Sequence, residues 1–237
     1  MFMELKRFYG SKIGDKLVLT DREYYHCVKV TRHKSGYSLI VCIGDGKDYY
    51  ATIDNITNAE VICSVESIVD NNSETRAPLI LCQAVCKELD FIVQKSVELG
   101  VTDIIPFYSE RTNVKKVSQE RLENIIVDAA KQCGRAKLPI VHEATDFKGA
   151  LSKTASCGNK VFCYENERNQ TIESVIANRD EATVVIIGSE GGFSESEVEY
   201  AVAQGYKVVT LGRRILRAET AAIVALALTL DGINDIC

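Results

Sequence analysis

Two segments of this sequence are rich in glycine or charged residues, and each directly follows an apolar run. The first, GSEGG at residues 188–192, follows TVVII, and the second, LGRRILRAE at 211–219, follows YKVVT. Glycines at 188, 191 and 192 allow positive φ and let a ligand approach the backbone. Ligands of open α/β sheets bind beyond the carboxyl ends of the strands. Either loop alone would also fit a tight connection, but two such loops favour a ligand site.

The surroundings of the two loops narrow the kind of site. GSEGG matches neither G-x-G-x-x-G nor a phosphate loop that ends in Gly-Lys-Ser/Thr. Ser194 and Glu197 have the spacing of a capping box, which predicts a helix after the first loop. The second loop continues into a helix that is almost wholly apolar after Thr220. Such a helix must be buried on nearly all sides, either inside the fold or against a second copy of the chain. A homodimer is therefore one of two interpretations.

The elements that position these loops alternate in type from residue 77 to 237. Helix candidates follow Leu89 and Ser118, closing at Gly100 and Gly134, and occupy TIESVIANR (171–179) and SESEVEYAVAQG (194–205). Strand candidates are LILCQAV (79–85), VTDIIPFY (101–108), KVFCYE (160–165), TVVIIG (183–188) and YKVVTLG (206–212). This order predicts an α/β domain with a largely parallel sheet.

Residues 1–70 have a different pattern. Short β-like runs (KLVLT, YSLIVCI, YYATI and AEVICSVESIV) predict a small barrel or compact sheet, and the polar segment DNNSETRAP (70–78) is the expected linker. The net charge is −5, yet residues 1–50 contain nine basic against six acidic side chains, and residues 111–137 contain seven against three. Each basic zone fits either an ordinary solvated face or a polyanionic partner.

Cysteine spacing and hydropathy exclude several classes of protein. The nine cysteines, from Cys27 to Cys237, form no C-x-x-C pair and no Cys/His set with zinc spacing, so we expect core residues and no metal site. No apolar stretch approaches the roughly 20 residues of a membrane span. We expect a cytoplasmic protein without a membrane partner.

Four motifs together resemble a known family. ELGVTDIIPFYSERTNVK, AAKQCGRAKLP, IIGSEGGFSESEVE and LGRRILRAETAA are similar to the bacterial 16S ribosomal RNA uridine-N3 methyltransferases, which belong to the SPOUT superfamily of trefoil-knotted methyltransferases. The resemblance implies an α/β-knot domain at 77–237 and a PUA-like β-barrel RNA-binding domain at 1–70. Ser189 and Arg213 stand where that family usually has proline, and Ala218 where it usually has threonine.

The resemblance also implies the cofactor. In that superfamily S-adenosylmethionine lies bent between the two knot loops, where backbone groups contact adenine. The corresponding cofactor-binding residues are Ile187, Gly188, Glu190, Gly191, Gly192, Leu211, Gly212, Ile215, Leu216 and Ala221.

Methylation of uridine N3 requires an exposed base and either loss of the N3 proton or stabilisation of the resulting anion. Arg217 is the first candidate for a cation beside the uracil carbonyls, with an ion pair to Glu219 or Glu190 as the alternative. Glu219 is expected to act as a base or to orient Arg217, and Glu190 is expected to face the sulfonium charge.

The implied partner is 16S ribosomal RNA or the 30S subunit. Candidate RNA contacts are Arg7, His26, Lys29, Arg32, Arg111 and Arg135. His26 also fits a hydrogen-bonded histidine of the barrel, and Arg111 and Arg135 also fit surface ion pairs. Three competing functions stay open: a SPOUT enzyme for another nucleotide or a ribose 2′-hydroxyl, a non-catalytic RNA-binding dimer, and a nicotinamide-dependent oxidoreductase.

Overall fold

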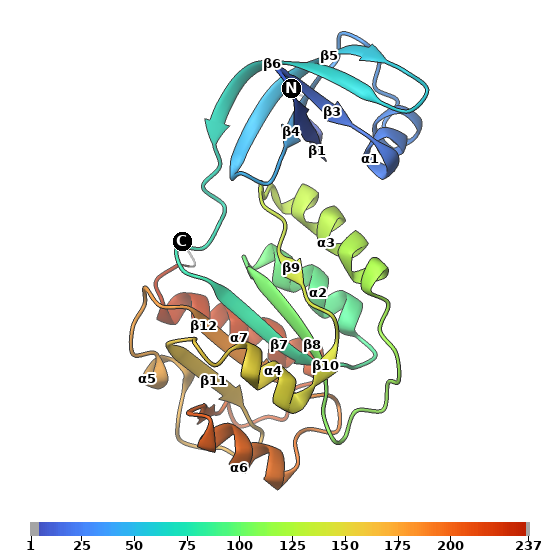
Figure 1. Ribbon diagram of the computed structural model, residues 1–237. Helices are drawn as coiled ribbons and strands as arrows, with labels where there is room; N and C mark the ends of the chain where they lie inside the picture. Colours follow the sequence, from blue (N-terminus) through green and yellow to red (C-terminus); the bar gives the residue numbers. More distant parts are fainter. Residues whose placement is uncertain (1–4, 236–237) are drawn as a thin grey trace. The chain divides into compact units, whose positions relative to one another are not determined.

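The computed structural model describes residues 5–235, so Cys237 lies outside the described residues. The chain forms two compact units (Figure 1). Unit 1 contains the chain up to Glu74 together with Ala130–Leu138, and unit 2 contains Thr75–Ala129 and the chain from Pro139 onward. The boundary after Glu74 falls inside the segment that we interpreted as the linker. The sequence did not indicate that Ala130–Leu138 belong with unit 1.

Unit 1 is built on a six-stranded sheet in the order β1-β4-β5-β6-β3-β2. The β1–β4 pair is parallel and the other pairs are antiparallel, so the sheet is mixed. All four predicted β-like runs are strands, and two short strands precede them. The strands are β1 (Arg7–Tyr9), β2 (Ser11–Ile13), β3 (Lys16–Leu19), β4 (Ser38–Cys42), β5 (Lys47–Ile56) and β6 (Val61–Asp70).

Alternation along the strands builds the core of unit 1. Tyr49, Ala51 and Ile53 of β5 are buried in one apolar cluster, because every second side chain of a strand faces the same side. Two short helical turns, α1 (Asp21–Tyr25) and a π-helix (His26–Val30), were not predicted. They lack a helical apolar stripe of their own and contribute one fully buried side chain, Cys27, so tertiary packing decides their conformation.

Residues 130–138 are attached to unit 1 by hydrogen bonds. The Tyr9 hydroxyl donates to the carbonyl of Arg135 (2.8 Å), and the Asn71 side-chain amide donates to the carbonyl of Gly134 (2.9 Å). The Lys131 ammonium lies 2.7 Å from the Glu23 carboxylate. These contacts join positions more than 60 residues apart, which local sequence patterns do not report.

Unit 2 contains a seven-stranded sheet in the order β10-β8-β7-β12-β11-β13, with β9 also paired to β8. Every strand pair of this sheet is parallel, where a largely parallel sheet was predicted. The strands are β7 (Leu79–Ala84), β8 (Asp103–Tyr108), β9 (Ile140–Val141), β10 (Thr145–Asp146), β11 (Asn159–Cys163), β12 (Thr183–Ile187) and β13 (Lys207–Val209). The strand after Tyr206 is shorter than its sequence pattern indicated.

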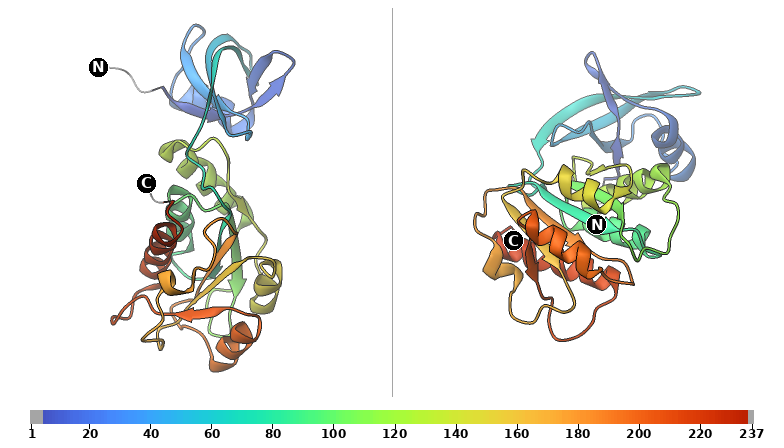
Figure 2. Two further views of the ribbon diagram at one scale, coloured as in Figure 1. Left: turned by 90° about the vertical axis from the view of Figure 1, so that its left-hand side faces the viewer. Right: turned by 60° about the horizontal axis from the view of Figure 1, so that its bottom comes forward.

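Helices cover both faces of this sheet (Figure 2). Helices α4 and α6 pack on one face over a cluster of phenylalanines, and α2 and α7 pack together on the other. The helices are α2 (Leu89–Glu98), α3 (Gln119–Cys133), α4 (Phe147–Lys153), α5 (Ile172–Val175), α6 (Glu195–Ala203) and α7 (Ala218–Gly232). Helix α4 was not predicted. The prediction of a helix over 171–179 was wrong in length, since α5 ends at Val175 and Ile176 is extended.

The apolar helix α7 is not buried on all sides within one chain. Ala222, Ala225 and Leu226 are fully buried, whereas Leu228 is 44% exposed. The side chains of Ile223 and Val224 are half-buried. Of the two interpretations, burial by the chain alone is therefore incomplete, because α7 packs against β12, α2 and α5 while Leu228 stays exposed.

Candidate functional site

The first predicted ligand loop is fixed at both ends. Strand β12 before it is wholly buried. After it, the Phe193 ring lies 4.4 Å from the Phe162 ring, measured between centroids. The Ser194 hydroxyl accepts from the backbone N–H of Glu197 (3.3 Å), and the Glu197 carboxylate accepts from the N–H of Ser194 (3.0 Å). This reciprocal capping box confirms the predicted helix start and holds residues 188–192 between rigid elements.

Glycine at 191 allows a close approach of two loops. A Cβ added at Gly191 would lie 3.0 Å from the backbone oxygen of Arg111. The Arg111 guanidinium donates to the Gly191 carbonyl (3.2 Å), and the Ser189 hydroxyl donates to the Arg111 carbonyl (3.4 Å). The loop after β8 is thereby packed on the GSEGG loop, and an alanine at 191 would separate the two backbones.

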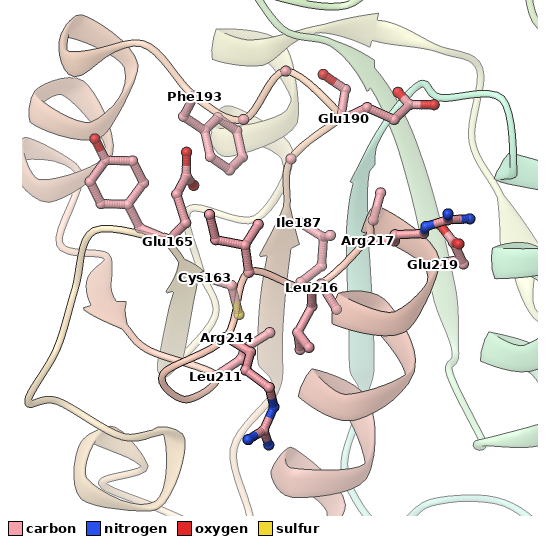
Figure 3. A pocket seen from close by; sticks show the side chains of 18 of the residues that line it. Cys163, Glu165, Ile187, Glu190, Phe193, Leu211, Arg214, Leu216, Arg217 and Glu219 are labelled. Carbon is pink, nitrogen blue, oxygen red and sulfur yellow. The ribbon is translucent and has the colours of Figure 1, made fainter.

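The two predicted loops line one cavity of about 700 Å³ at the carboxyl ends of β11, β12 and β13 (Figure 3). Strand β11 lies between β12 and β13, so the loops that follow its two neighbours flank a shared space. All ten residues predicted to bind a cofactor line this cavity: Ile187, Gly188, Glu190, Gly191, Gly192, Leu211, Gly212, Ile215, Leu216 and Ala221.

The predicted catalytic pair lies in the same cavity. Arg217 is the N-cap residue of α7 and Glu219 stands in its first turn, and both line the cavity. The Arg217 side chain is exposed. In the described part of the chain, no ion pair within 4.0 Å joins Arg217 to Glu219 or Glu190. The Glu190 carboxylate instead accepts from the backbone N–H of Lys87 (3.1 Å). The alternative of an Arg217 ion pair is therefore not seen.

Several lining residues were missed by sequence reasoning. Cys163 ends β11, Tyr164 and Glu165 follow it, and Lys87 and Glu88 follow β7. The rule that ligands bind at the carboxyl ends of parallel strands could have found them, but the sequence does not give the strand order. The additional lining is completed by Ser189, Phe193, Thr210, Arg214 and Ala218. Figure 3 shows Arg214 directed away from Arg217.

Two predicted RNA contacts in unit 1 are engaged in ion pairs. Arg7 donates to both oxygens of Asp48 (2.5 and 2.7 Å), and both side chains are almost buried. Although burial raises the pKa of Asp48, hydrogen bonds from Arg7 and Asn71 hold it below its usual value. Arg135 is 3% exposed and donates to both oxygens of Glu74 (3.2 and 2.6 Å). For Arg135 the structure shows the ion pair that was the alternative, although it is buried rather than on the surface.

The other unit 1 candidates lie nearer the surface. His26 is half-buried, with Nδ1 3.0 Å from the Lys131 ammonium and its ring 5.5 Å from that of Phe8. Lys29 and Arg32 are exposed, and Arg32 has a left-handed backbone (φ +56°). The sixth candidate, Arg111, belongs to unit 2, where it is exposed and holds the loop at Gly191.

Among residues 5–235, no group of three or more His, Cys, Asp or Glu side chains is arranged to hold a metal ion. No helix in the same range has the length and apolarity needed to cross a bilayer.

Comparisons with known proteins place the chain among RNA methyltransferases. Residues 73–230 match the RNA methyltransferase domain family. Ribosomal RNA small subunit methyltransferase E of Mesomycoplasma hyopneumoniae is 32% identical, over 92% of this chain and 96% of the relative. The protein of the same name from Bacillus subtilis is 30% identical, over 88% and 87%. The crystal structure of the Neisseria gonorrhoeae protein of that name, bound to S-adenosyl methionine, superposes with a TM-score of 0.87 at 30% identity over 96% and 98%. The chain belongs to the RNA methyltransferase family that includes the ribosomal RNA small subunit methyltransferases E.

Proposed function

We propose that this protein transfers a methyl group from S-adenosylmethionine to N3 of a uridine in 16S ribosomal RNA. The main supporting observation is that the ten residues assigned to the cofactor, together with Arg217 and Glu219, line a single cavity. The names of the relatives support a small-subunit ribosomal RNA substrate, and the Neisseria gonorrhoeae structure supports the cofactor.

The residues of the cavity fit S-adenosylmethionine. Ile187, Leu211 and Leu216 provide apolar side chains for the faces of a flat adenine ring. The glycine-rich loop leaves backbone groups accessible, and the carboxylates of Glu165 and Glu190 complement a ligand with sulfonium and ammonium charges. When bound, S-adenosylmethionine supplies an electrophilic methyl group on a positively charged sulfur.

Arg217 and Glu219 act on the uridine. The Arg217 guanidinium is not engaged by Glu190 or Glu219, so it is available to donate hydrogen bonds to a uracil carbonyl and to stabilise negative charge as N3 loses its proton. Glu219, two residues along α7, accepts that proton or orients Arg217. Ile187 and Phe193, each 2% exposed, exclude water from the inner wall of the cavity.

The same proposal includes a threaded chain. Strand β13 lies at the sheet edge beside β11, whereas α7 packs against β12 and α2. The chain through residues 211–217 therefore passes from β13 beyond β11 to reach α7, and this path supports a trefoil knot of the SPOUT type. For unit 1, the mixed sheet over a closed apolar cluster supports a PUA-like barrel that binds RNA.

RNA binding by unit 1 is assigned to its exposed side chains. Lys29 and Arg32 are exposed beside the exposed apolar side chains of Tyr25 and Val30, a mixture that suits phosphates and unstacked bases. Arg7 and Arg135 are not assigned to RNA, because their ion pairs with Asp48 and Glu74 hold segments of unit 1 together. A ribosomal RNA substrate would place the protein in the cytoplasm, with 16S RNA or the 30S subunit as its partner.

A homodimer is also part of the proposal. The apolar side of α7 that the chain leaves open, with Leu228 44% exposed and Val224 half-buried, would be covered by a second copy. Burial of this surface is favourable at about 25 cal/mol per Å² of apolar area. Sedimentation equilibrium would test it, and a monomer at micromolar concentration would exclude a stable dimer.

Label transfer tests the enzymatic function. The protein is incubated with methyl-labelled S-adenosylmethionine and either 30S subunits lacking the modification or naked 16S RNA, and the nucleosides are analysed. Labelled 3-methyluridine is the expected product. Arg217→Ala should lower turnover about 100-fold or more, as loss of a group that stabilises transition-state charge does. Arg213→Ala is the matched control, because Arg213 is exposed in the same loop and does not line the cavity.

The other outcomes identify the alternatives. Label in a different nucleoside or in a 2′-O-methyl group would indicate another RNA methyltransferase. RNA binding without label transfer would indicate a non-catalytic RNA-binding protein. If calorimetry detects binding of NAD but no binding of S-adenosylmethionine, the protein is the oxidoreductase.

A further inference from the structure

Gln83 is an unusual residue for its position. It lies in β7, a strand whose other members are apolar, and its side chain is fully buried. A buried amide is unfavourable unless its donors and acceptor are hydrogen-bonded, so its presence needs a reason. In the sheet, Gln83 is level with Ile187, the last residue of β12 before the GSEGG loop.

The Gln83 amide holds the start of that loop. Its Nε2 donates to the carbonyl of Ala84 (2.9 Å) and to the carbonyl of Gly188 (3.2 Å). A flipped amide would put Oε1 against these two carbonyls, so the pair of acceptors fixes the orientation. The Oε1 atom has no hydrogen-bond partner among residues 5–235.

This contact sets the direction of the next peptide group. In a trans peptide the C=O and the following N–H point in opposite directions, and the described chain has no cis peptide. Because the Gly188 carbonyl is directed at Gln83, the Ser189 N–H points away from it. Strand β7 lies on one side of β12 and β11 on the other, and Cys163 and Glu165 at the end of β11 line the cavity.

The Ser189 N–H is an available donor in this position. Ser189 is 7% exposed and lines the cavity, and within the described chain its N–H donates to no acceptor. A buried N–H without a partner is rare in folded proteins and is a natural group for ligand binding. Proline, which the resemblance leads one to expect at 189, has no N–H to offer.

We infer that the Ser189 N–H donates a hydrogen bond to an acceptor atom of the bound methyl donor, and that Gln83 is the positioning residue that aims it through the Gly188 carbonyl. The inference rests on the proposed cofactor and adds a donor specific to this chain. Gln83 does not line the cavity and acts only through the loop.

Three single variants and one double variant test the inference. Ser189→Pro removes the N–H, Ser189→Ala keeps it and removes only the hydroxyl, and Gln83→Met removes the amide at similar volume. The dissociation constant of S-adenosylmethionine is measured by calorimetry on the full chain. Ser189→Pro and Gln83→Met should each weaken binding about 10-fold, and Ser189→Ala less than about 3-fold, since a net hydrogen bond has this size.

Coupling separates positioning from a general loss of stability. If both residues serve one hydrogen bond, the double variant Gln83→Met/Ser189→Pro should bind about as tightly as either single variant. Thr229→Val, which removes another buried hydrogen bond in unit 2 (2.7 Å to the Ala225 carbonyl), should leave binding unchanged at a similar loss of stability.

The inference is overturned if Ser189→Pro binds S-adenosylmethionine as tightly as the wild type does. It is also overturned if the increases in the dissociation constant caused by the two substitutions multiply in the double variant. Should Gln83→Met fail to fold, the comparison of Ser189→Pro with Ser189→Ala decides by itself whether the N–H is used. Failure of the proposed function would look different, because the wild-type protein would then bind no S-adenosylmethionine.

Discussion

Replacing Gly192 with alanine should weaken cofactor binding through a displaced carboxylate. Gly192 has a left-handed backbone (φ +66°), and a Cβ added there would lie 2.5 Å from Oε1 of Glu165. Since Oε1 is the far end of a flexible side chain, Glu165 can rotate away at little cost in stability. The carboxylate then leaves its place on the cavity wall, where Figure 3 shows it beside Phe193.

The magnitude has two separable parts. Forcing an alanine into the left-handed region costs about 1 kcal/mol in the free energy of unfolding. The second part concerns the free energy of cofactor binding. If Glu165 accepts a hydrogen bond from the methyl donor, its displacement should weaken binding by about 1.5–3 kcal/mol, which is roughly a 10- to 100-fold increase in the dissociation constant.

Gly14 provides a matched control. It has nearly the same backbone conformation (φ +62°), and a Cβ added there meets nothing within 4 Å. Gly14→Ala should lower the stability as much as Gly192→Ala in urea unfolding while leaving calorimetric binding of S-adenosylmethionine unchanged. Wild-type affinity in Gly192→Ala would refute the reasoning, as would a further loss when Gly192→Ala is added to Glu165→Ala.

Three further predictions concern charges and thiols. Although burial raises the pKa of Asp48, hydrogen bonds from Arg7 and Asn71 lower it in the folded state below the unfolded value of 3.8. The contribution of Asp48 to stability should therefore be present above pH 3.8 and be lost as the pH falls through the lower folded value. Urea unfolding of Asp48→Asn should lack this pH dependence. Glu74→Ala should destabilise the protein by about 3 kcal/mol, because it leaves the buried Arg135 charge without its carboxylate; chemical denaturation measures this, and a loss under 1 kcal/mol would contradict it. Burial raises the pKa of Cys163 to about 12, so the thiol should not react with iodoacetamide at pH 8 in the native protein, although Cys163 lines the cavity. Mass spectrometry detects the label, and rapid labelling of Cys163 would show that the thiol is accessible.

The sequence by itself determined the elements of the site. Buried strands read as continuous apolar runs, and the turns after them show their glycines and caps, so TVVII, GSEGG and the capping box at Ser194 could be placed from local patterns. Together with the family resemblance, local sequence also made Arg217 and Glu219 catalytic candidates, because both lie at the end of the second loop. Each of these features depends on residues that are neighbours along the chain.

Only the tertiary structure decided which residues meet. The order β12-β11-β13 places Glu165 between the two loops, and neither loop's sequence contains that order. Arg135 shows the same limit, because its type and loop position suited RNA, whereas contacts with Glu74 and Tyr9 bury it. An ion pair between residues 61 positions apart and a strand order both depend on how distant segments pack. Packing of that kind leaves no periodic signal in the sequence.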